Sequence, residues 1–185
     1  MIQKRDLTTI PNLLSFGRIA GVTVAVALYL AGHEPLALGV GAVACLTDYF
    51  DGYLARKLKQ ETALGAMLDQ AADSFTTAIA LAMLVVAGGI PFAFLVIFLL
   101  REFWVATVRR YAASAGIDIP SAPMGKVATA MIYFAILAVA MAILPETPEL
   151  LSSLHTPAIL SLGLGLAISC LTGWRYTKIL GGVKT

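Results

Sequence analysis

Charged residues are scarce in this chain, and their scarcity excludes an ordinary soluble domain. Lys, Arg, Asp and Glu make up 13% of the 185 residues, whereas hydrophobic residues make up 59%. Soluble domains carry roughly 25% charged residues, so this composition is typical of a membrane protein. The net charge is only +2, and no nucleic-acid partner is expected.

Cysteine and histidine are also rare. The two cysteines, Cys45 and Cys170, lie in apolar stretches, which argues against a disulfide framework or a zinc site. The two histidines, His33 and His155, have no clustered ligands near them in the sequence. We therefore assign no function to these four residues.

Long apolar runs, in contrast, fill most of the chain. A bilayer core about 30 Å thick needs roughly 20 apolar residues in a helix. The sequence predicts a single all-α membrane domain over residues 1–185, with six transmembrane helices at about residues 10–31, 36–55, 65–87, 90–112, 125–144 and 158–179. Gly- and Pro-containing breaks such as GHEP, GGIP and PETPE separate several of them. The segment before Pro11 is interpreted as a short helix on the membrane surface.

The basic residues predict the orientation of these helices. With six spans and both termini on one side, all 13 Lys and Arg residues fall on that side. The opposite side receives only Glu34, Glu146, Glu149 and the two histidines. The positive-inside rule therefore predicts that both termini are cytoplasmic.

Four aspartates lie among apolar residues in the stretch LTDYFDGYLARKLKQETALGAMLDQAADSF. Asp48 and Asp51 are three residues apart, and Asp69 and Asp73 are four residues apart. Both spacings put the members of a pair on one face of a helix. The polar turn RKLKQET lies between the two pairs, so we expect the four carboxylates to face one another near the cytoplasmic end of the helices.

Four carboxylates that converge in a membrane need compensating charge. A charged group at membrane depth is costly and usually marks a functional site. Hard oxygen ligands suit magnesium, manganese or calcium, and two metals about 4 Å apart can clamp a transferring phosphoryl group. The pattern therefore predicts a two-metal site. The alternative is a solvated helical turn in which the acids pair with Arg56, Lys57 and Lys59.

The complete pattern resembles a known signature. It reads Asp48-x2-Asp51-Gly52-x2-Ala55-Arg56-x8-Gly65-x3-Asp69-x3-Asp73. This is similar, at every specified position, to the signature of the CDP-alcohol phosphotransferase family. The resemblance implies six membrane helices, a homodimer and two divalent metals, Mg²⁺ or Mn²⁺, in each active site. It also implies transfer of a phosphoalcohol from a CDP-linked donor to an alcohol acceptor, with release of CMP.

The same resemblance implies roles for single residues. The four aspartates would be metal ligands, and Asp73 would also be the general base that takes the proton from the attacking hydroxyl. The residues expected beside the cytidine and pyrophosphate of the donor are Asn12, Gly52, Ala55, Arg56, Thr62 and Gly65. For two of them an alternative stays open, because Asn12 can also cap the first helix and Gly65 can also serve close helix packing.

A second cluster is basic. Arg101, Arg109 and Arg110 lie in LREFWVATVRR, and Lys126 lies in PMGKVAT. We interpret the four side chains as a pocket for the phosphate of a water-soluble acceptor. The alternative is an internal ion pair with Glu102, with the arginines extended toward the membrane surface. The pattern RE-x6-R followed by GK resembles the bacterial phosphatidylglycerophosphate synthases, which implies CDP-diacylglycerol as donor, glycerol 3-phosphate as acceptor and the bacterial inner membrane as location.

Other functions and one structural question stay open. A cardiolipin synthase of the same fold, with phosphatidylglycerol as acceptor, is the nearest rival, and an inositol phosphate or serine acceptor is a more distant one. A divalent-cation transporter could use the same four acids, although the outer halves of the predicted helices lack a polar relay. Glycines that could serve either a dimer face or internal packing are Gly39, Gly41, Gly163 and Gly165.

Overall fold

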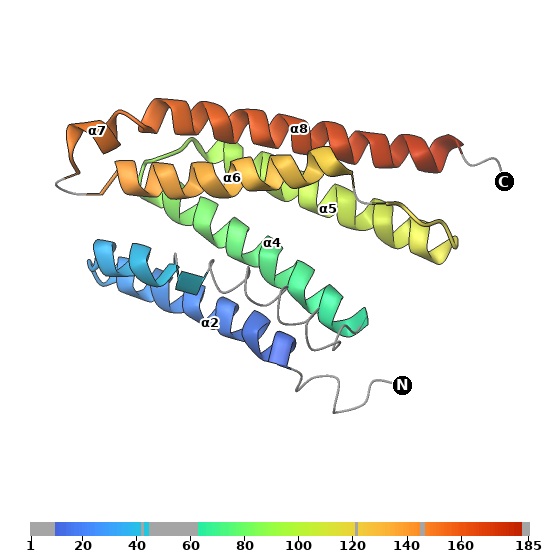
Figure 1. Cartoon of the computed structure of the whole chain (residues 1–185), viewed down its shortest axis with the longest axis horizontal. Coiled ribbons are helices and arrows are strands. Elements are labelled where there is room, and N and C mark those ends of the chain that lie inside the picture. The colour runs from blue at the N-terminus through green and yellow to red at the C-terminus, as the bar shows by residue number, and fades with distance from the viewer. Residues whose placement is uncertain (1–9, 42, 45–62, 121, 145–146, 183–185) are drawn as a thin grey trace. The chain divides into compact units, whose positions relative to one another are not determined.

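The computed structural model describes residues 10–41, 43–44, 63–120, 122–144 and 147–182. Within these ranges every regular element is a helix (Figure 1), which confirms the predicted all-α class. The chain divides into two compact units, Met1–Met83 and Leu84–Thr185.

The first unit contains α2, a second helical segment and most of α4. α2 spans Ile10–Leu30, the next segment is helical at residues 34–41 and 43–44, and α4 spans Ala63–Val86. α2 ends at Gly32, where φ is +82°, with hydrogen bonds from the Gly32 N–H to the Tyr29 carbonyl and from the His33 N–H to the Leu28 carbonyl. This is a Schellman ending, which glycine favours because it has no Cβ.

Small residues bring α2 close to the helical segment that follows it. A Cβ added to Gly21 would lie 3.0 Å from the Ala44 Cβ, and one added to Gly41 would lie 3.7 Å from the Ala25 Cβ. Contacts of this kind let two helix backbones approach closely. Of the two roles that the sequence left open for Gly41, internal packing is therefore the one observed.

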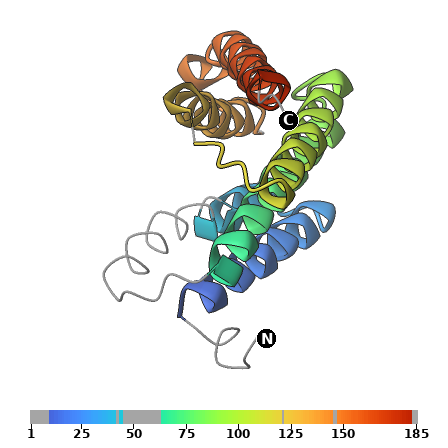
Figure 2. The ribbon, with the colours of Figure 1, turned by 90° about the vertical axis from the view of Figure 1, so that its right-hand side faces the viewer.

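The second unit is built around α8. It contains α5 (Phe92–Ser114), α6 (Pro123–Ala142), α7 (Glu149–Ser152) and α8 (His155–Gly182). α8 packs along both α6 and α5, and α7 contacts α6; Figure 2 shows α6 and α8 side by side. The short α7 is an element that the sequence did not indicate, since only a break was predicted there.

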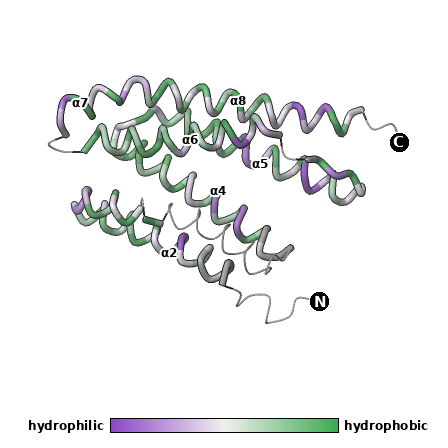
Figure 3. Tube along the Cα trace, in the orientation of Figure 1, coloured by the Kyte–Doolittle hydropathy of each residue, from purple (hydrophilic) through white to green (hydrophobic). Residues whose placement is uncertain are grey.

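Apolar side chains cover both the inner and the outer faces of these helices. The buried residues of α6 recur at every third or fourth position, which puts them on one face; they are Ala128, Ile132, Ala135 and Val139. Outward-facing residues are apolar as well, because Phe103, Phe134 and Leu160 are 72%, 72% and 69% exposed. Figure 3 shows mostly hydrophobic residues along α6. Helices that are apolar all round are typical of membrane spans.

The prediction of six membrane spans is not confirmed by the described residues, although part of the chain has the composition of a span. Two stretches of the described residues, Pro123–Ala142 and Glu149–Gly182, are long and apolar enough to cross a bilayer. α5 is less apolar because it carries four charged residues, Arg101, Glu102, Arg109 and Arg110. The second predicted span, residues 36–55, lies only partly within the described residues.

Replacing Gly165 by alanine is expected to lower the free energy of unfolding by about 1–3 kcal/mol. A Cβ at this position would lie 3.1 Å from Ile132 Cγ1, 3.2 Å from the Ala128 carbonyl oxygen and 3.3 Å from Met131 Cβ. The carbonyl oxygen belongs to the backbone of α6 and cannot rotate away, so α6 and α8 must separate. Thermal unfolding in detergent measures the effect.

Gly163→Ala is the matched control, two residues earlier on the same helix. A Cβ there would lie 3.5 Å from the Phe94 ring, which is an ordinary contact, and alanine favours a helix over glycine by up to about 1 kcal/mol. We therefore expect this variant to be at least as stable as the wild type. Equal destabilisation by the two substitutions would contradict the assignment of Gly165 to the α6–α8 contact.

Candidate active site

Two of the four predicted acids lie together on α4, and a buried arginine of α2 binds both. Asp69 and Asp73 are one helical turn apart, as their spacing predicts. Arg18 Nη1 donates a hydrogen bond to Asp73 Oδ1, and Arg18 Nη2 donates to Asp69 Oδ1 at 3.2 Å. All three residues belong to the first unit. The guanidinium thus bridges the two carboxylates in a forked contact.

Burial differs sharply between the arginine and the acids. The side chain of Arg18 is 1% exposed, whereas those of Asp69 and Asp73 are 48% and 39% exposed. The two acids carry two negative charges against one positive charge, so the group keeps a net negative charge. Their carboxylate oxygens are ligands that Mg²⁺ and Mn²⁺ prefer, and a guanidinium already interacts with them as a cation. The residues present therefore fit part of a divalent metal site.

The other half of the predicted ligand set lies outside the described residues. Asp48 and Asp51 belong to residues 45–62, which the structure does not describe. Among the residues that it does describe, no group of three or more His, Cys, Asp or Glu side chains gathers in one place. The convergence of all four aspartates therefore stays a prediction.

Arg18 is a site residue that the sequence analysis missed. It was counted there only among the basic residues of the cytoplasmic side. A signal was available, since Arg18 is the only charged residue in the sequence of α2, IPNLLSFGRIAGVTVAVALYL. An arginine in an apolar membrane helix needs a partner, but the sequence does not say that this partner is 51 and 55 residues away.

Most of the residues predicted to bind the donor lie outside the described part. This applies to Gly52, Ala55, Arg56 and Thr62. Asn12 lies in the first turns of α2, but its side chain is not described. Gly65 is half-buried in α4, one turn before Asp69, so its backbone borders the face that carries the two aspartates. The donor site as a whole stays a prediction.

The basic residues of α5 make different contacts in the second unit. Arg101 Nη1 donates a hydrogen bond to Glu102 Oε1, with side chains that are 18% and 21% exposed. The internal ion pair that the sequence left open is therefore present for Arg101. Arg110, farther along α5, and Lys126 on α6 are both exposed, so they are accessible to a charged ligand. A common phosphate pocket for all four basic residues stays a prediction.

Arg109 contacts a tyrosine that the sequence analysis did not single out. Its guanidinium carbon lies 5.3 Å from the centre of the Tyr176 ring, within the range of a cation–π contact. Tyr176 is 4% exposed, and its hydroxyl accepts a hydrogen bond from the Ala122 N–H at 3.1 Å. Tyr176 thereby joins α5 to the start of α6, the helix that carries Lys126. No sequence spacing links these residues.

Arg101 and Arg109 each have one N–H donor that lacks a protein acceptor. In the described part of the chain, Nε of Arg101 and Nε of Arg109 are buried without a hydrogen-bond partner. A buried N–H of this kind is unfavourable unless a ligand or water accepts from it. The two side chains therefore have capacity for an anionic group that their protein contacts do not use.

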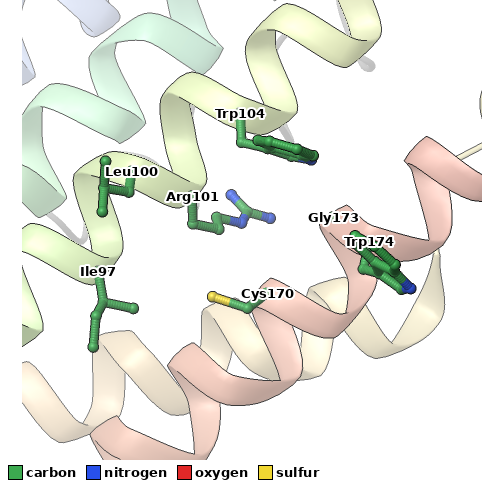
Figure 4. Close-up of a pocket in the computed structure, with 7 residues that line it drawn as sticks. All are labelled: Ile97, Leu100, Arg101, Trp104, Cys170, Gly173 and Trp174. Carbon is green, nitrogen blue, oxygen red and sulfur yellow. The ribbon is translucent and has the colours of Figure 1, made fainter.

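An open groove of about 350 Å³ runs between α5 and α8 beside Arg101 (Figure 4). Of the described residues that line it, Arg101 alone is charged, and the others are Ile97, Leu100, Trp104, Cys170, Gly173 and Trp174. Trp104 is fixed across the two helices by a hydrogen bond from its Nε1 to Thr177 Oγ1 at 3.0 Å. The groove is thus mostly apolar, with one cationic group along its wall.

Apolar outward faces are typical of helices in a membrane protein, and carboxylates and arginines are residue types that can bind metals and phosphate groups. A comparison with known families is more specific, because residues 8–170 match the sequence model of the CDP-alcohol phosphatidyltransferase family. The chain belongs to this family, and it is therefore a transferase. The resemblance found in the aspartate signature is confirmed.

Named relatives match nearly the full chain. The CDP-diacylglycerol–glycerol-3-phosphate 3-phosphatidyltransferase of Bacillus subtilis is 31% identical over 182 residues, which cover 90% of this chain and 92% of the relative. The enzyme of the same name from Rickettsia bellii is 29% identical, with 91% and 93% covered. A probable phosphatidylglycerophosphate synthase of Mycobacterium tuberculosis is 29% identical, with 96% and 86% covered.

Proposed function

We propose that this protein transfers the phosphatidyl group of CDP-diacylglycerol to glycerol 3-phosphate, which forms phosphatidylglycerol phosphate and releases CMP. The observation that carries this proposal is the similarity to relatives of about equal length whose names state this donor and acceptor, such as the Bacillus subtilis enzyme with 90% of this chain and 92% of the relative aligned. The basic side chains of α5 agree with a phosphate-bearing acceptor.

The proposed setting is the bacterial inner membrane. Residues 1–185 would form one domain with six spans, both termini in the cytoplasm, and two copies would form a homodimer. Support comes from the two stretches that are apolar enough to cross a bilayer and from the exposed apolar side chains of α5, α6 and α8. The one-sided distribution of Lys and Arg supports the orientation.

In the proposed active site, Asp48, Asp51, Asp69 and Asp73 hold two divalent metals, Mg²⁺ or Mn²⁺. When bound, such metals neutralise phosphate oxygens and fix the donor in place. Members of this family generally use divalent metals. The cytidine and pyrophosphate of CDP-diacylglycerol would lie against Asn12, Gly52, Ala55, Arg56, Thr62 and Gly65.

The reaction needs one proton transfer and one displacement at phosphorus. Asp73 takes the proton from the attacking hydroxyl of glycerol 3-phosphate, and that oxygen forms a bond to the β-phosphorus of the donor. The bond between this phosphorus and the oxygen that bridges it to CMP breaks, and CMP leaves with the electron pair. Asp73 is 39% exposed, so a hydroxyl group can reach its carboxylate.

The acceptor phosphate would be held by Arg101, Arg109, Arg110 and Lys126. The buried Nε groups of Arg101 and Arg109 can donate to phosphate oxygens, and hydrogen bonds between charged groups are the stronger ones in proteins. The Tyr176 ring and the Ala122 bond to its hydroxyl would keep Arg109 and the start of α6 in place.

Replacing Arg109 by glutamine is expected to raise the KM for glycerol 3-phosphate about tenfold or more and to change the KM for CDP-diacylglycerol little. A hydrogen bond to a charged group contributes about 1.5–3 kcal/mol, and 1.4 kcal/mol corresponds to a factor of ten. Steady-state CMP release, with one substrate varied at a time, measures both constants.

Lys178→Gln is the control for charge, because it too removes one positive charge from a helix of the second unit, at a position that is exposed and outside the proposed acceptor site. Both variants are first compared with the wild type by thermal unfolding, since Arg109 also packs on Tyr176. An unchanged KM for glycerol 3-phosphate in a folded Arg109→Gln protein would remove this residue from the acceptor site.

The proposed function is tested with purified protein in mild detergent. CMP release from CDP-diacylglycerol is followed in Mg²⁺, with glycerol 3-phosphate, phosphatidylglycerol, inositol 1-phosphate and serine offered in separate reactions. We expect release with glycerol 3-phosphate alone.

Other outcomes would redirect the proposal. Release with phosphatidylglycerol alone would make the protein a cardiolipin synthase and return Arg101 and Arg109 to a structural role. Release with inositol 1-phosphate or serine alone would keep the donor and change the acceptor. If protein that binds metal releases no CMP with any acceptor, the result would contradict CDP-diacylglycerol as the donor and would favour divalent-cation transport.

A further inference from the structure

Arg18 is the largest fully buried side chain of the described residues, and it is charged. Its side chain is 1% exposed, and it is the only charged residue of α2. Burial of a guanidinium is unfavourable unless acceptors and negative charge surround it. Asp69 and Asp73 provide both through the two bonds from Arg18.

The carboxylates that Arg18 binds belong to two of the four aspartates that the family signature assigns to metals. Nη1 and Nη2 each reach one oxygen, Oδ1, of a different aspartate. The side chains of Asp69 and Asp73 are 48% and 39% exposed, so both keep surface that Arg18 does not cover. A cation that binds these carboxylates from solution therefore approaches a group whose charge Arg18 has already partly neutralised.

We propose that Arg18 is a positioning residue that serves as the internal counter-cation of Asp69 and Asp73, and that divalent metal competes with it for their negative charge. This inference rests on the proposed metal site. In the metal-free protein Arg18 keeps the two aspartates from repelling each other. In the metal-bound protein its fixed positive charge weakens metal binding, which makes the metal easier to release.

Two consequences follow for a variant without the charge. We expect two uncharged variants, Arg18→Gln and Arg18→Met, to bind Mn²⁺ at least about tenfold more tightly than the wild type, because a like charge close to the metal is gone. The methionine variant replaces the guanidinium by an unbranched apolar side chain. The metal-free variants should also be less stable than the metal-free wild type, because the carboxylates lose their counter-ion. Added Mn²⁺ should restore that stability.

The experiment measures Mn²⁺ affinity by titration calorimetry and thermal unfolding with and without Mn²⁺, on full-length protein in detergent without substrates. Arg18→Lys keeps the positive charge, and we expect its affinity to stay within about threefold of the wild type. Arg175→Gln removes one charge elsewhere, from an exposed arginine whose side chain bonds to Met124 Sδ, and should leave the affinity unchanged.

Each result decides the proposal. Tighter Mn²⁺ binding in Arg18→Gln and Arg18→Met, with wild-type affinity in Arg18→Lys, supports it. Unchanged or weaker binding in the two uncharged variants overturns it, as does equal tightening in Arg18→Lys. Uncharged variants that stay unfolded in saturating Mn²⁺ also overturn it, because metal should replace the missing charge. Wild-type protein that binds no Mn²⁺ would overturn the proposed metal site as well, so the two failures are distinguishable.

Discussion

Replacing Asp73 by asparagine is expected to lower the rate of CMP release by at least about a thousandfold. The asparagine amide has nearly the same shape as the carboxylate, but it can neither accept a proton from glycerol 3-phosphate nor supply negative charge to a metal. General-base catalysis alone contributes about 10²–10⁴ in rate, and the loss of a metal ligand adds to that. CMP release at saturating donor and acceptor measures the effect.

Asp118→Asn is the matched control for this prediction. Asp118 is exposed in the segment between α5 and α6, and the substitution makes the same chemical change outside the signature. We expect wild-type rates from it. Mn²⁺ titration of Asp73→Asn separates the two roles, because a variant that still binds metal but releases no CMP has lost the base. Full CMP release by Asp73→Asn would show that the base is another group.

Removal of divalent metal is expected to lower the rate of CMP release by at least about a thousandfold, and added Mg²⁺ or Mn²⁺ should restore it. A metal bound to a phosphoryl group contributes several kcal/mol to stabilisation of the transition state, and each 1.36 kcal/mol is a factor of ten in rate. The experiment dialyses the protein against EDTA, measures CMP release, and then adds back each metal in turn.

Two measurements make the metal experiment specific to the proposed site. Calorimetric titration of the EDTA-treated wild type should give two Mn²⁺ ions per chain, as the resemblance implies, and Asp69→Asn should bind fewer or bind them more weakly. Donor pyrophosphate also binds metals, so the titration is done without CDP-diacylglycerol. Undiminished CMP release after EDTA treatment would contradict a metal-dependent mechanism.

Arg18 supplies positive charge to the acid pair from within the protein. The sequence offered two sources of compensating charge for the aspartates, divalent metals or the basic residues of the turn that follows Asp51. The structure adds a third, an arginine from α2 that is bound to Asp69 and Asp73. If the proposed metals bind, they and the arginine compensate the same negative charge, and the metal-free protein would depend on the arginine alone.

The local properties of this chain could be predicted from its sequence. The helical class followed from apolar runs of membrane length, and the observed α2, α4, α5, α6 and α8 begin and end close to the predicted limits. Family membership followed from the aspartate signature, because a fixed spacing within one short stretch is readable without a fold. The placement of Asp69 and Asp73 one turn apart is of the same kind, since the helix itself determines it.

Contacts between distant parts of the chain were decided only by the tertiary structure. The pairing of Arg18 with two aspartates joins residues that are 51 and 55 positions apart, and the stacking of Arg109 on Tyr176 joins α5 to α8. The role of Gly165 belongs here too, because only the packing of α8 on α6 shows that a Cβ would meet the Ala128 carbonyl. Helical periodicity states which face a residue occupies, but it does not state which other helix covers that face.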